Sequence, residues 1–248
     1  MITTSLQNEK ELFKSRPNFF PPKIEWDSYA QIFTEHNMLG WLKNSLIVAI
    51  CSTALSVPVS LFAAYSISRL KFRGSQFTMF LMLLTQMLPV TLIVLPLFVI
   101  FKDLKLLDTH KGLVLANFTF SLPLSISILK GFLDTIPKEI EEAAAIDGCS
   151  KWLMIPKVIV PISLPGLVSS SVIAFFASWN EYLFASTFIN NEAKWLGTVG
   201  LASFQGVFLT PWNKVLAAST VYTLPALIFY LFVQKYIVSG LTAGSVKG

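Results

Sequence analysis

A short acidic segment stands out in a chain that otherwise carries few charges. Residues 141–152 read EEAAAIDGCSKW, which places two glutamates, three alanines, an aspartate and a glycine between two long apolar runs. Small side chains let another backbone approach closely, and a carboxylate beside them can pair with a basic residue of a partner. The chemistry that this segment suits is therefore protein docking. The two histidines, His36 and His110, lie far apart and show no metal-ligand spacing.

The composition indicates what kind of elements must position this segment. Of the 248 residues, 54% are hydrophobic and only 13% are charged, whereas soluble domains carry about 25% charged residues. The net charge of +5 fits lysines and arginines on cytoplasmic loops, so no nucleic-acid partner is expected. These values predict an all-α integral membrane protein that spans the lipid bilayer several times.

Five apolar runs predict membrane-spanning helices, each of which needs about 20 residues. They divide the chain into a polar N-terminal segment, residues 1–44, and a membrane domain, residues 45–248. The predicted spans are residues 45–67, 77–101, 113–129, 167–188 and 215–233. The prolines inside them predict either packing kinks or bends along a path: Pro58, Pro89, Pro96, Pro123 and Pro225.

The loop 69–73 sets the orientation, because it carries Arg69, Lys71 and Arg73 and no acid. It is predicted to be cytoplasmic, and so are the loop 130–166 and the C-terminus. The inside segments hold nine Lys and Arg against five in the two outside loops. Residues 1–44 would then lie outside although they carry five basic residues. A further span before residue 1 would remove this conflict.

The cytoplasmic loop 130–166 predicts two short helices joined at a glycine. Asp134 or Thr135 is expected to cap the first helix, with Pro137 in its first turn and Gly148 as its C-terminal stop. Ser150 is expected to cap a second helix, residues 151–155. An amphipathic helix lying on lipid is the alternative, but such helices carry a basic polar face and large apolar residues. The acidic, alanine-rich face favours docking to a protein.

The spacing within this loop resembles the EAA loop of ABC importer permeases. The family pattern is E-A-A-x3-G-x9-I-x-L-P, and the chain departs from it by Val158 for Ile and Val160 for Leu. The flanking residues 130–148, the sequence WNEY at 179–182 and the tail 238–248 are similar to the sugar-transporter branch, which includes maltose permeases. The motif residues that the resemblance assigns to ATPase coupling are Glu142, Ala143, Ala144, Asp147, Gly148 and Pro161. Members of this branch have six spans, so the family's first span is expected to be missing here.

The resemblance implies a permease subunit in a bacterial inner membrane. Its implied partners are separate ABC ATPase subunits, a second and different permease subunit, and an extracellular substrate-binding protein. The chain has no G-x-x-x-x-G-K-[ST] phosphate loop, so it is expected to bind no cofactor and to rely on ATP used by the ATPase subunits. It is therefore expected to be a transport subunit and not an enzyme.

Asn180 and Glu181 are further candidates, because polar residues within the predicted fourth span can line a pore. A structural hydrogen bond between helices is the alternative for both. Other function classes also remain open at this point: a permease for glycerol phosphate or an amino acid, a secondary transporter, or an intramembrane enzyme. The sequence names neither the sugar nor the residues that contact it.

Overall fold

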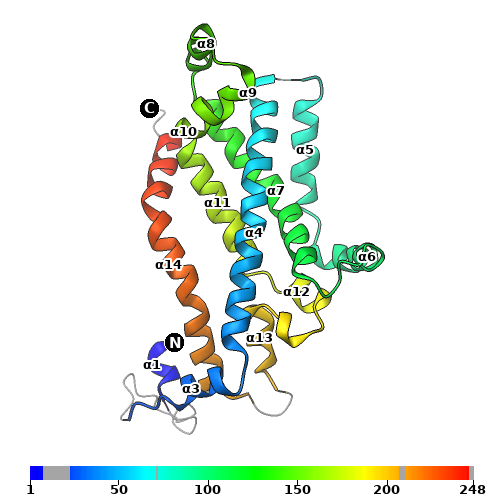
Figure 1. Cartoon of the computed structure of the whole chain (residues 1–248), viewed down its shortest axis with the longest axis vertical. Helices are drawn as coiled ribbons and strands as arrows, with labels where there is room; N and C mark the ends of the chain where they lie inside the picture. Colours follow the sequence, from blue (N-terminus) through cyan, green and yellow to red (C-terminus); the bar gives the residue numbers. More distant parts are fainter. Residues whose placement is uncertain (8–22, 71, 207–209, 246–248) are drawn as a thin grey trace. The chain divides into compact units, whose positions relative to one another are not determined.

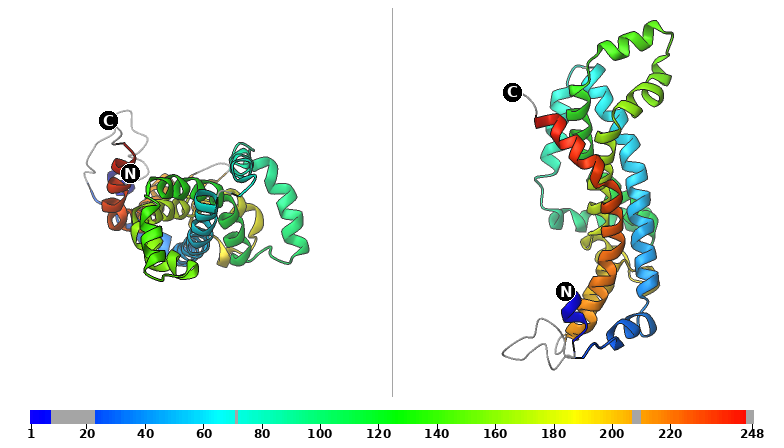
Figure 2. Two further views of the ribbon diagram at one scale, coloured as in Figure 1. Left: turned by 90° about the horizontal axis from the view of Figure 1, so that it is seen from above. Right: turned by 90° about the vertical axis from the view of Figure 1, so that its left-hand side faces the viewer.

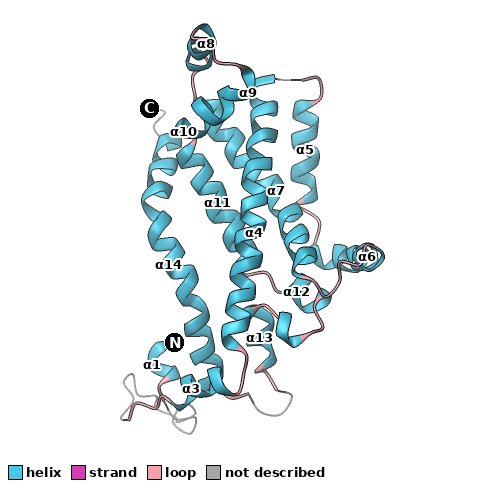
Figure 3. Ribbon diagram, in the orientation of Figure 1, coloured by secondary structure: helices cyan, strands magenta, loops and turns pink. Residues whose placement is uncertain are grey.

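The computed structural model describes residues 1–7, 23–70, 72–206 and 210–245, and all side chains among these except those of Lys151 and residues 236–245. This part of the chain consists of helices and their connections and contains no strand (Figure 3), so the predicted all-α class is confirmed. The α-helices are α1 (Ile2–Ser5), α3 (Asp27–Thr34), α4 (Met38–Tyr65), α5 (Ser75–Thr85), α6 (Val90–Asp103), α7 (His110–Thr135), α8 (Glu139–Ile146), α9 (Lys151–Met154), α10 (Val160–Ile162), α11 (Leu164–Trp179), α12 (Leu183–Phe188), α13 (Gly197–Ser203) and α14 (Trp212–Ser245) (Figure 1). Two π-helical turns, η1 (Ser66–Leu70) and η2 (Ile155–Ile159), and one 3-10 turn, η3 (Glu192–Lys194), complete the helical elements.

The chain divides into two compact units that interleave along the sequence. The first unit comprises Met1–Val48, Val94–Leu113 and Trp179–Phe229, and the second comprises Ala49–Ile93, Val114–Ser178 and Tyr230–Gly248. This division runs through long helices and does not coincide with the predicted division into residues 1–44 and 45–248. The functional division at residue 44 therefore stays a prediction. That boundary falls inside α4, since the helix already begins at Met38.

Three helices are long and apolar enough to cross a membrane: Met38–Leu70, His110–Thr135 and Trp212–Lys235. Two bent helix pairs bring the number to as many as five if each pair forms one span. The number of predicted spans agrees with this upper count. The predicted second span, residues 77–101, is a bent pair of helices, and the predicted fourth span, residues 167–188, is interrupted where α11 ends at Trp179. The pair Ser75–Thr85 and Val90–Asp103 bends by 97°, and the pair Trp152–Ile162 and Leu164–Trp179 bends by 81°.

Prolines explain part of this difference. Pro89 lies in the break between α5 and α6, where the residue before a proline disfavours helical backbone. Its carbonyl accepts the Leu92 amide at 3.0 Å, as expected at a new helix start. The other predicted kink prolines stay inside continuous helices: Pro58, Pro96, Pro123 and Pro225. The bend in the second predicted span thus falls at one of the five prolines that were predicted to kink or bend a span.

The second unit is built around one apolar cluster. Leu61, Ala64 and Ile67 follow each other at the spacing of one helical face, and α7 supplies a matching stripe. These two stripes pack against the segment that follows α8, and Ala144 and Cys149 pack against the same cluster. The remaining buried members of the cluster are Ile126, Leu129, Leu133, Ile136, Met154, Ile155, Ile159 and Leu167. The loop after α7 is thus anchored to the helices and is not detached from them.

Aromatic packing organises the first unit. Trp179 and Tyr222 stack with their ring centroids 4.6 Å apart and 14° between planes, and the Tyr222 hydroxyl donates to the Trp179 carbonyl at 2.6 Å. Trp41 is fully buried beside Gly200, where a Cβ atom would collide with the indole ring. These contacts give the segment after α11 a fixed course within this unit.

Candidate functional site

The loop 130–166, predicted to be cytoplasmic, is named here the inner loop, and its first helix, α8, begins later than predicted. Its N-cap residue is Lys138, and no side chain caps it. Asp134 and Thr135 belong instead to the last turn of α7, so the prediction that one of them caps α8 was wrong. The reason is that Asp134 is already bonded: it accepts from Ser68 Oγ at 2.5 Å and from Lys130 Nζ at 2.6 Å.

The predicted stop at Gly148 is confirmed. Gly148 has φ of +83°, a left-handed backbone that favours glycine. The Cys149 amide donates to the Ala144 carbonyl at 2.9 Å, and the Gly148 amide donates to the Ala145 carbonyl at 3.1 Å. This pair of bonds is the Schellman motif, which satisfies the last carbonyls of a helix and reverses the chain.

The second predicted helix is also present, as α9, and it ends one residue earlier than expected. Ser150 occupies the N-cap position with extended backbone, but its side chain makes no capping bond. Pro156 does not end the helical course, because the chain continues through η2 into α10, which contains Pro161. Pro161 is exposed near the 81° bend that precedes α11.

Helix α8 has two different faces. On one face, Glu141 is largely buried and Ala144 packs against the apolar cluster of the second unit. On the other face, Glu142, Ala143 and Asp147 are exposed. Within the described residues, the Glu142 carboxylate makes no hydrogen bond or ion pair. Figures 1 and 2 show α8 extending beyond the neighbouring end of α4.

Two large apolar side chains lie near the exposed face of α8. Ile146 and Trp152 are each 86% exposed, and they flank the turn at Gly148. Burying such side chains against a partner removes apolar area from water and stabilises the complex. The loop therefore presents a surface of small, acidic and large apolar side chains, which we name the free face and define as Glu142, Ala143, Ile146, Asp147 and Trp152.

An ion pair that sequence reasoning did not find holds the opposite face. Arg69 Nε lies 2.5 Å from Glu141 Oε1, and these side chains are only 8% and 14% exposed. Tyr65 donates to Glu141 Oε2 at 3.0 Å, and Arg69 Nη2 donates to the Ile136 carbonyl at 3.0 Å. The sequence marked Arg69 only as a positive loop charge. Its acidic partner lies 72 positions away, and no local pattern connects the two.

In the first unit, Asn180 and Glu181 occupy a break between α11 and α12. They were predicted to lie within a helix that continued to residue 188, and that prediction was wrong. Asn180 is exposed, whereas both oxygens of Glu181 accept backbone amides of α12, from Phe184 at 2.6 Å and Ala185 at 2.9 Å. Glu181 thus caps the next helix, since unpaired amides at a helix start need acceptors.

Residues 189–197 of the first unit, in the loop predicted to lie outside and named here the outer segment, are held by their own chain. Asp108 accepts the amides of Asn190 and Asn191 through Oδ1 and the Lys194 ammonium through Oδ2 at 2.8 Å. The Lys194 ammonium, followed by the Asn191 amide, lowers the pKa of the Asp108 carboxyl below its ordinary value. Asn44 also donates to the carbonyls of Ala193 and Trp195, each at 3.0 Å.

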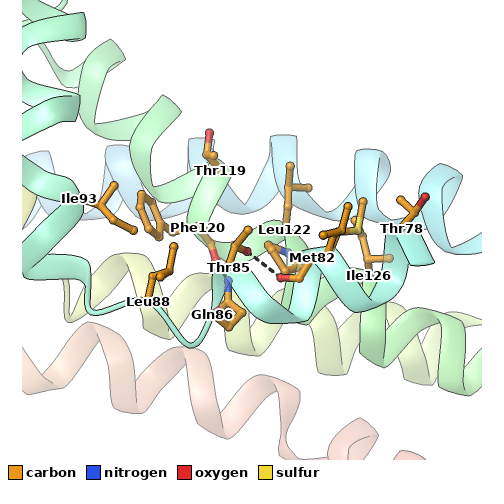
Figure 4. Close-up of a pocket in the computed structure, with 12 residues that line it drawn as sticks. Thr78, Met82, Thr85, Gln86, Leu88, Ile93, Thr119, Phe120, Leu122 and Ile126 are labelled. Carbon is orange, nitrogen blue, oxygen red and sulfur yellow. Dashed lines mark hydrogen bonds between the residues drawn. The ribbon is translucent and has the colours of Figure 1, made fainter. Parts of the chain in front are cut away.

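An apolar pocket of about 520 Å³ lies in the second unit between α5 and α7 (Figure 4). Met82, Phe120 and Ile126 are among its lining residues, and Gln86 donates from its rim to the Phe120 carbonyl at 3.2 Å. No residue that lines it is ionisable. An ion-coupled site needs charged or protonatable groups, so this pocket gives no support to a secondary transporter. Among the described residues, no cluster of His, Cys, Asp and Glu could hold a metal ion.

Several apolar helices with bent spans, joined to a short acidic helix with an exposed face, define a polytopic membrane protein. The profile of the binding-protein-dependent transport system inner membrane component matches residues 56–242. The chain belongs to this family. It is therefore a multi-pass inner-membrane transport subunit and not an enzyme.

Curated relatives span all or nearly all of the chain. The inner membrane ABC transporter permease protein YcjP of Escherichia coli (strain K12) is 36% identical over 100% of this chain and 89% of its own length. The sulfoquinovosyl glycerol transport system permease protein SmoH of Agrobacterium fabrum is 36% identical over 100% of this chain and 87% of its own. The trehalose/maltose transport system permease protein MalG of Thermococcus litoralis is 37% identical over 95% and 88%.

A solved structure shares the fold. One chain of the crystal structure of a bacterial ABC transporter involved in the import of the acidic polysaccharide alginate matches with a TM-score of 0.79. The match covers 95% of this chain and 88% of that chain at 21% identity, and at that identity it supports the fold alone.

Proposed function

We propose that this chain is a membrane-spanning permease subunit of an ATP-driven sugar importer. Family membership supports the transport role, and the names of relatives at 36–37% identity support carbohydrate as the class of solute. Those names differ in the sugar, from sulfoquinovosyl glycerol to trehalose and maltose. The class is therefore proposed, and the individual sugar is left to experiment.

The free face of α8 and α9 is the observation that carries the coupling part of the proposal. Its apolar members Ile146 and Trp152 are almost fully exposed, and the Glu142 carboxylate has no partner among the residues that the structure describes. A partner with an apolar cleft and a basic rim would bury the first two and pair with the third. We assign this partner as the ATPase subunit. In this assignment Ala143 and Asp147 border the cleft, Gly148 sets the turn, and Pro161 returns the chain to the membrane.

The remaining partners complete the transporter. A second permease subunit, different from this chain, forms the other half of the path, and an extracellular substrate-binding protein delivers the sugar. The chain has no phosphate loop of its own, so the ATPase subunits supply the nucleotide site and this chain binds no cofactor. ATP can shift the permease between two conformations only if the ATP-bound ATPase binds one of them more tightly. The docked α8 carries that difference.

Asn180 remains the better candidate for the path of the two polar residues after α11. It is exposed in the helix break, and its side chain makes no hydrogen bond within the described residues. Both carboxylate oxygens of Glu181 are already bonded to the start of α12, so we propose that Glu181 acts on the path only by positioning that helix. Breaks in spans that line a cavity are typical of transport paths.

Uptake by intact cells tests the proposal. Cells expressing the chain with its partner subunits are given radiolabelled trehalose, maltose and sulfoquinovosyl glycerol, and in parallel glycerol phosphate and amino acids. Uptake is compared between the unaltered chain and Glu142→Lys. The proposal predicts uptake of one sugar that stops when ATP is depleted and in the Glu142→Lys variant, with the variant still present in the membrane. Uptake that follows the proton gradient and ignores ATP would identify a secondary transporter instead. Uptake of glycerol phosphate or an amino acid in place of every sugar would contradict the carbohydrate assignment alone.

A further inference from the structure

The buried face of α8 carries an ion-pair network that ties the inner loop to the end of the first long helix. Arg69 lies in η1, directly after α4, and Glu141 lies in the first turn of α8. The pair is 2.5 Å apart and almost fully removed from solvent. Tyr65, one turn before Arg69, donates to the second Glu141 oxygen at 3.0 Å. Both oxygens of this carboxylate are therefore used.

Three consecutive residues of the π-helical turn η1 contact three different parts of the second unit. Ile67 joins the apolar cluster, Ser68 donates to Asp134 of α7, and Arg69 binds Glu141 of α8. Such wide turns are rare in helices and often occur at functional positions. Arg69 additionally donates to the Ile136 carbonyl at 3.0 Å, in the link between α7 and α8. One turn thus fixes both ends of that link.

The two neighbouring glutamates of the motif consequently face different ways. Glu141 is bound by the chain itself, whereas Glu142 is exposed on the free face. A buried ion pair contributes little net stability compared with an apolar replacement, but breaking one partner is costly because the other charge remains buried. A guanidinium also stays charged at every accessible pH and holds its fork geometry. This arrangement suits a rigid mechanical joint.

We infer that Arg69, Glu141 and Tyr65 are positioning residues that make α8 and the inner end of α4 move as one body. The inference rests on the proposed docking of an ATPase to the free face. A displacement of docked α8 then reaches the first long helix through the ion pair directly, in addition to the covalent connection through α7. We name these three residues the clamp.

Distance measurement between spin labels tests the clamp. The native cysteines Cys51 and Cys149, both free, are replaced by serine, and labels are attached to Phe62→Cys and Glu139→Cys. Phe62 is 52% exposed on α4, and Glu139 is exposed at the start of α8 outside the free face. The chain is assembled with its partner permease and ATPase in lipid nanodiscs. Distances are recorded without nucleotide and with ATP plus vanadate.

The clamp predicts one narrow distance population that stays the same in both nucleotide states. Arg69→Ala should give a roughly twofold broader distribution that shifts when ATP and vanadate are added, because Glu141 loses its partner. The reversed pair, Arg69→Glu with Glu141→Arg, should restore the narrow population. Lys130→Ala is the matched control, since it removes a nearby exposed pair with Asp134 and should change nothing.

Two results would overturn the inference. The first is a label distance that already changes with nucleotide in the unaltered clamp. The second is an Arg69→Ala distribution identical to that of the unaltered chain. Should Arg69→Ala fail to reach the membrane, Tyr65→Phe and Glu141→Gln decide the matter, and two unchanged distributions would contradict the clamp. Retention of the ATPase during purification separates the two proposals: its loss from the unaltered chain contradicts docking, while its retention with a variable distance contradicts only the clamp.

Discussion

The outer segment of the first unit and the inner helix α8 of the second unit are held in opposite ways. Residues 189–197 bond to Asn44, Ser45, Asp108 and His110 of their own unit. Helix α8 bonds to its own unit through Glu141 alone among its glutamates, and its opposite face is exposed. The outer segment is thus tied to its own unit at several points, whereas one face of α8 remains exposed.

This difference indicates which segment is built for a partner. A loop in which many carbonyls and amides are already paired gains little when a partner offers further hydrogen bonds. A helix that is anchored on one side and carries exposed Ile146 and Trp152 nearby gains apolar burial when a partner covers it. The following predictions test that contrast, from the largest expected effect to the smallest.

Gly148→Pro should abolish sugar uptake while the protein remains in the membrane. Proline cannot adopt φ of +83°, and it lacks the amide that Gly148 donates to the Ala145 carbonyl. The turn between α8 and α9 is then lost, and with it the shape of the free face. Uptake and membrane abundance are measured side by side. The control is Gly131→Ala, because an added Cβ meets no atom there. Normal uptake by Gly148→Pro would show that the turn has no part in coupling.

Trp152→Ala and Ile146→Ala should each weaken ATPase binding by about 2 kcal/mol, or about 30-fold in Kd. Both side chains are exposed in the isolated chain and are expected to be buried by the ATPase. Binding is measured between the purified ATPase and the chain in nanodiscs. Trp26→Ala, an exposed tryptophan of the first unit, is the control and should bind normally. If Trp152→Ala bound the ATPase with the same Kd as the control Trp26→Ala, the free face would not be part of the interface.

Asn44→Ala should lower the stability of the first unit by about 1–3 kcal/mol, because two carbonyls lose their donor. Thermal unfolding in detergent measures the loss. ATPase binding should stay unchanged, since the outer segment is assigned no part in docking. Asn190→Ala is the matched control, because only the backbone amide of Asn190 contacts Asp108. A weaker ATPase affinity in Asn44→Ala would contradict the claim that the outer segment has no part in docking.

Acid should have the smallest effect. Protonating Asp108 should lower the free energy of unfolding by less than ~1 kcal/mol, because its ion pair with Lys194 is exposed. The pKa of Asp108 is lowered in the folded chain, so its stabilisation is complete above the ordinary carboxyl pKa. The stabilisation is lost as the pH falls below that value and through the lowered pKa. Unfolding of the unaltered chain and of Asp108→Asn is compared at about pH 6 and about pH 3. The difference between them should shrink at the lower pH, and a constant difference would assign it to something other than the charge.

The sequence predicted the elements of the inner loop well because their signals are local. Gly148 follows an alanine-rich helix at the position where a left-handed residue is needed, and Ser150 precedes the next helix. The apolar runs likewise revealed the spans through composition alone. The prediction of the α8 cap was wrong because the Asp134 carboxylate accepts a hydrogen bond from Ser68, which lies 66 positions away. Local propensity cannot report such a tertiary competitor.

The same limit explains what was missed at the candidate site. Arg69 was explained as a positive charge on a cytoplasmic loop, and Glu141 as an acid near the start of a helix. Because each had a local explanation, no pattern in the sequence pointed to their pairing. The break at Asn180 and Glu181 was hidden because apolar residues continue on both sides of it. Only folding shows that the Glu181 carboxylate starts a new helix.

Photo-cross-linking from two adjacent alanines of α8 tests the central claim most directly. A diazirine side chain is placed at Ala143, which is exposed, or at Ala144, which packs against the chain's own apolar cluster. The assembled transporter is irradiated, and the cross-linked products are identified by mass spectrometry. A two-faced α8 predicts a cross-link to the ATPase from position 143 and only a cross-link within this chain from position 144. Equal capture of the ATPase from both positions, or from neither, would contradict the account.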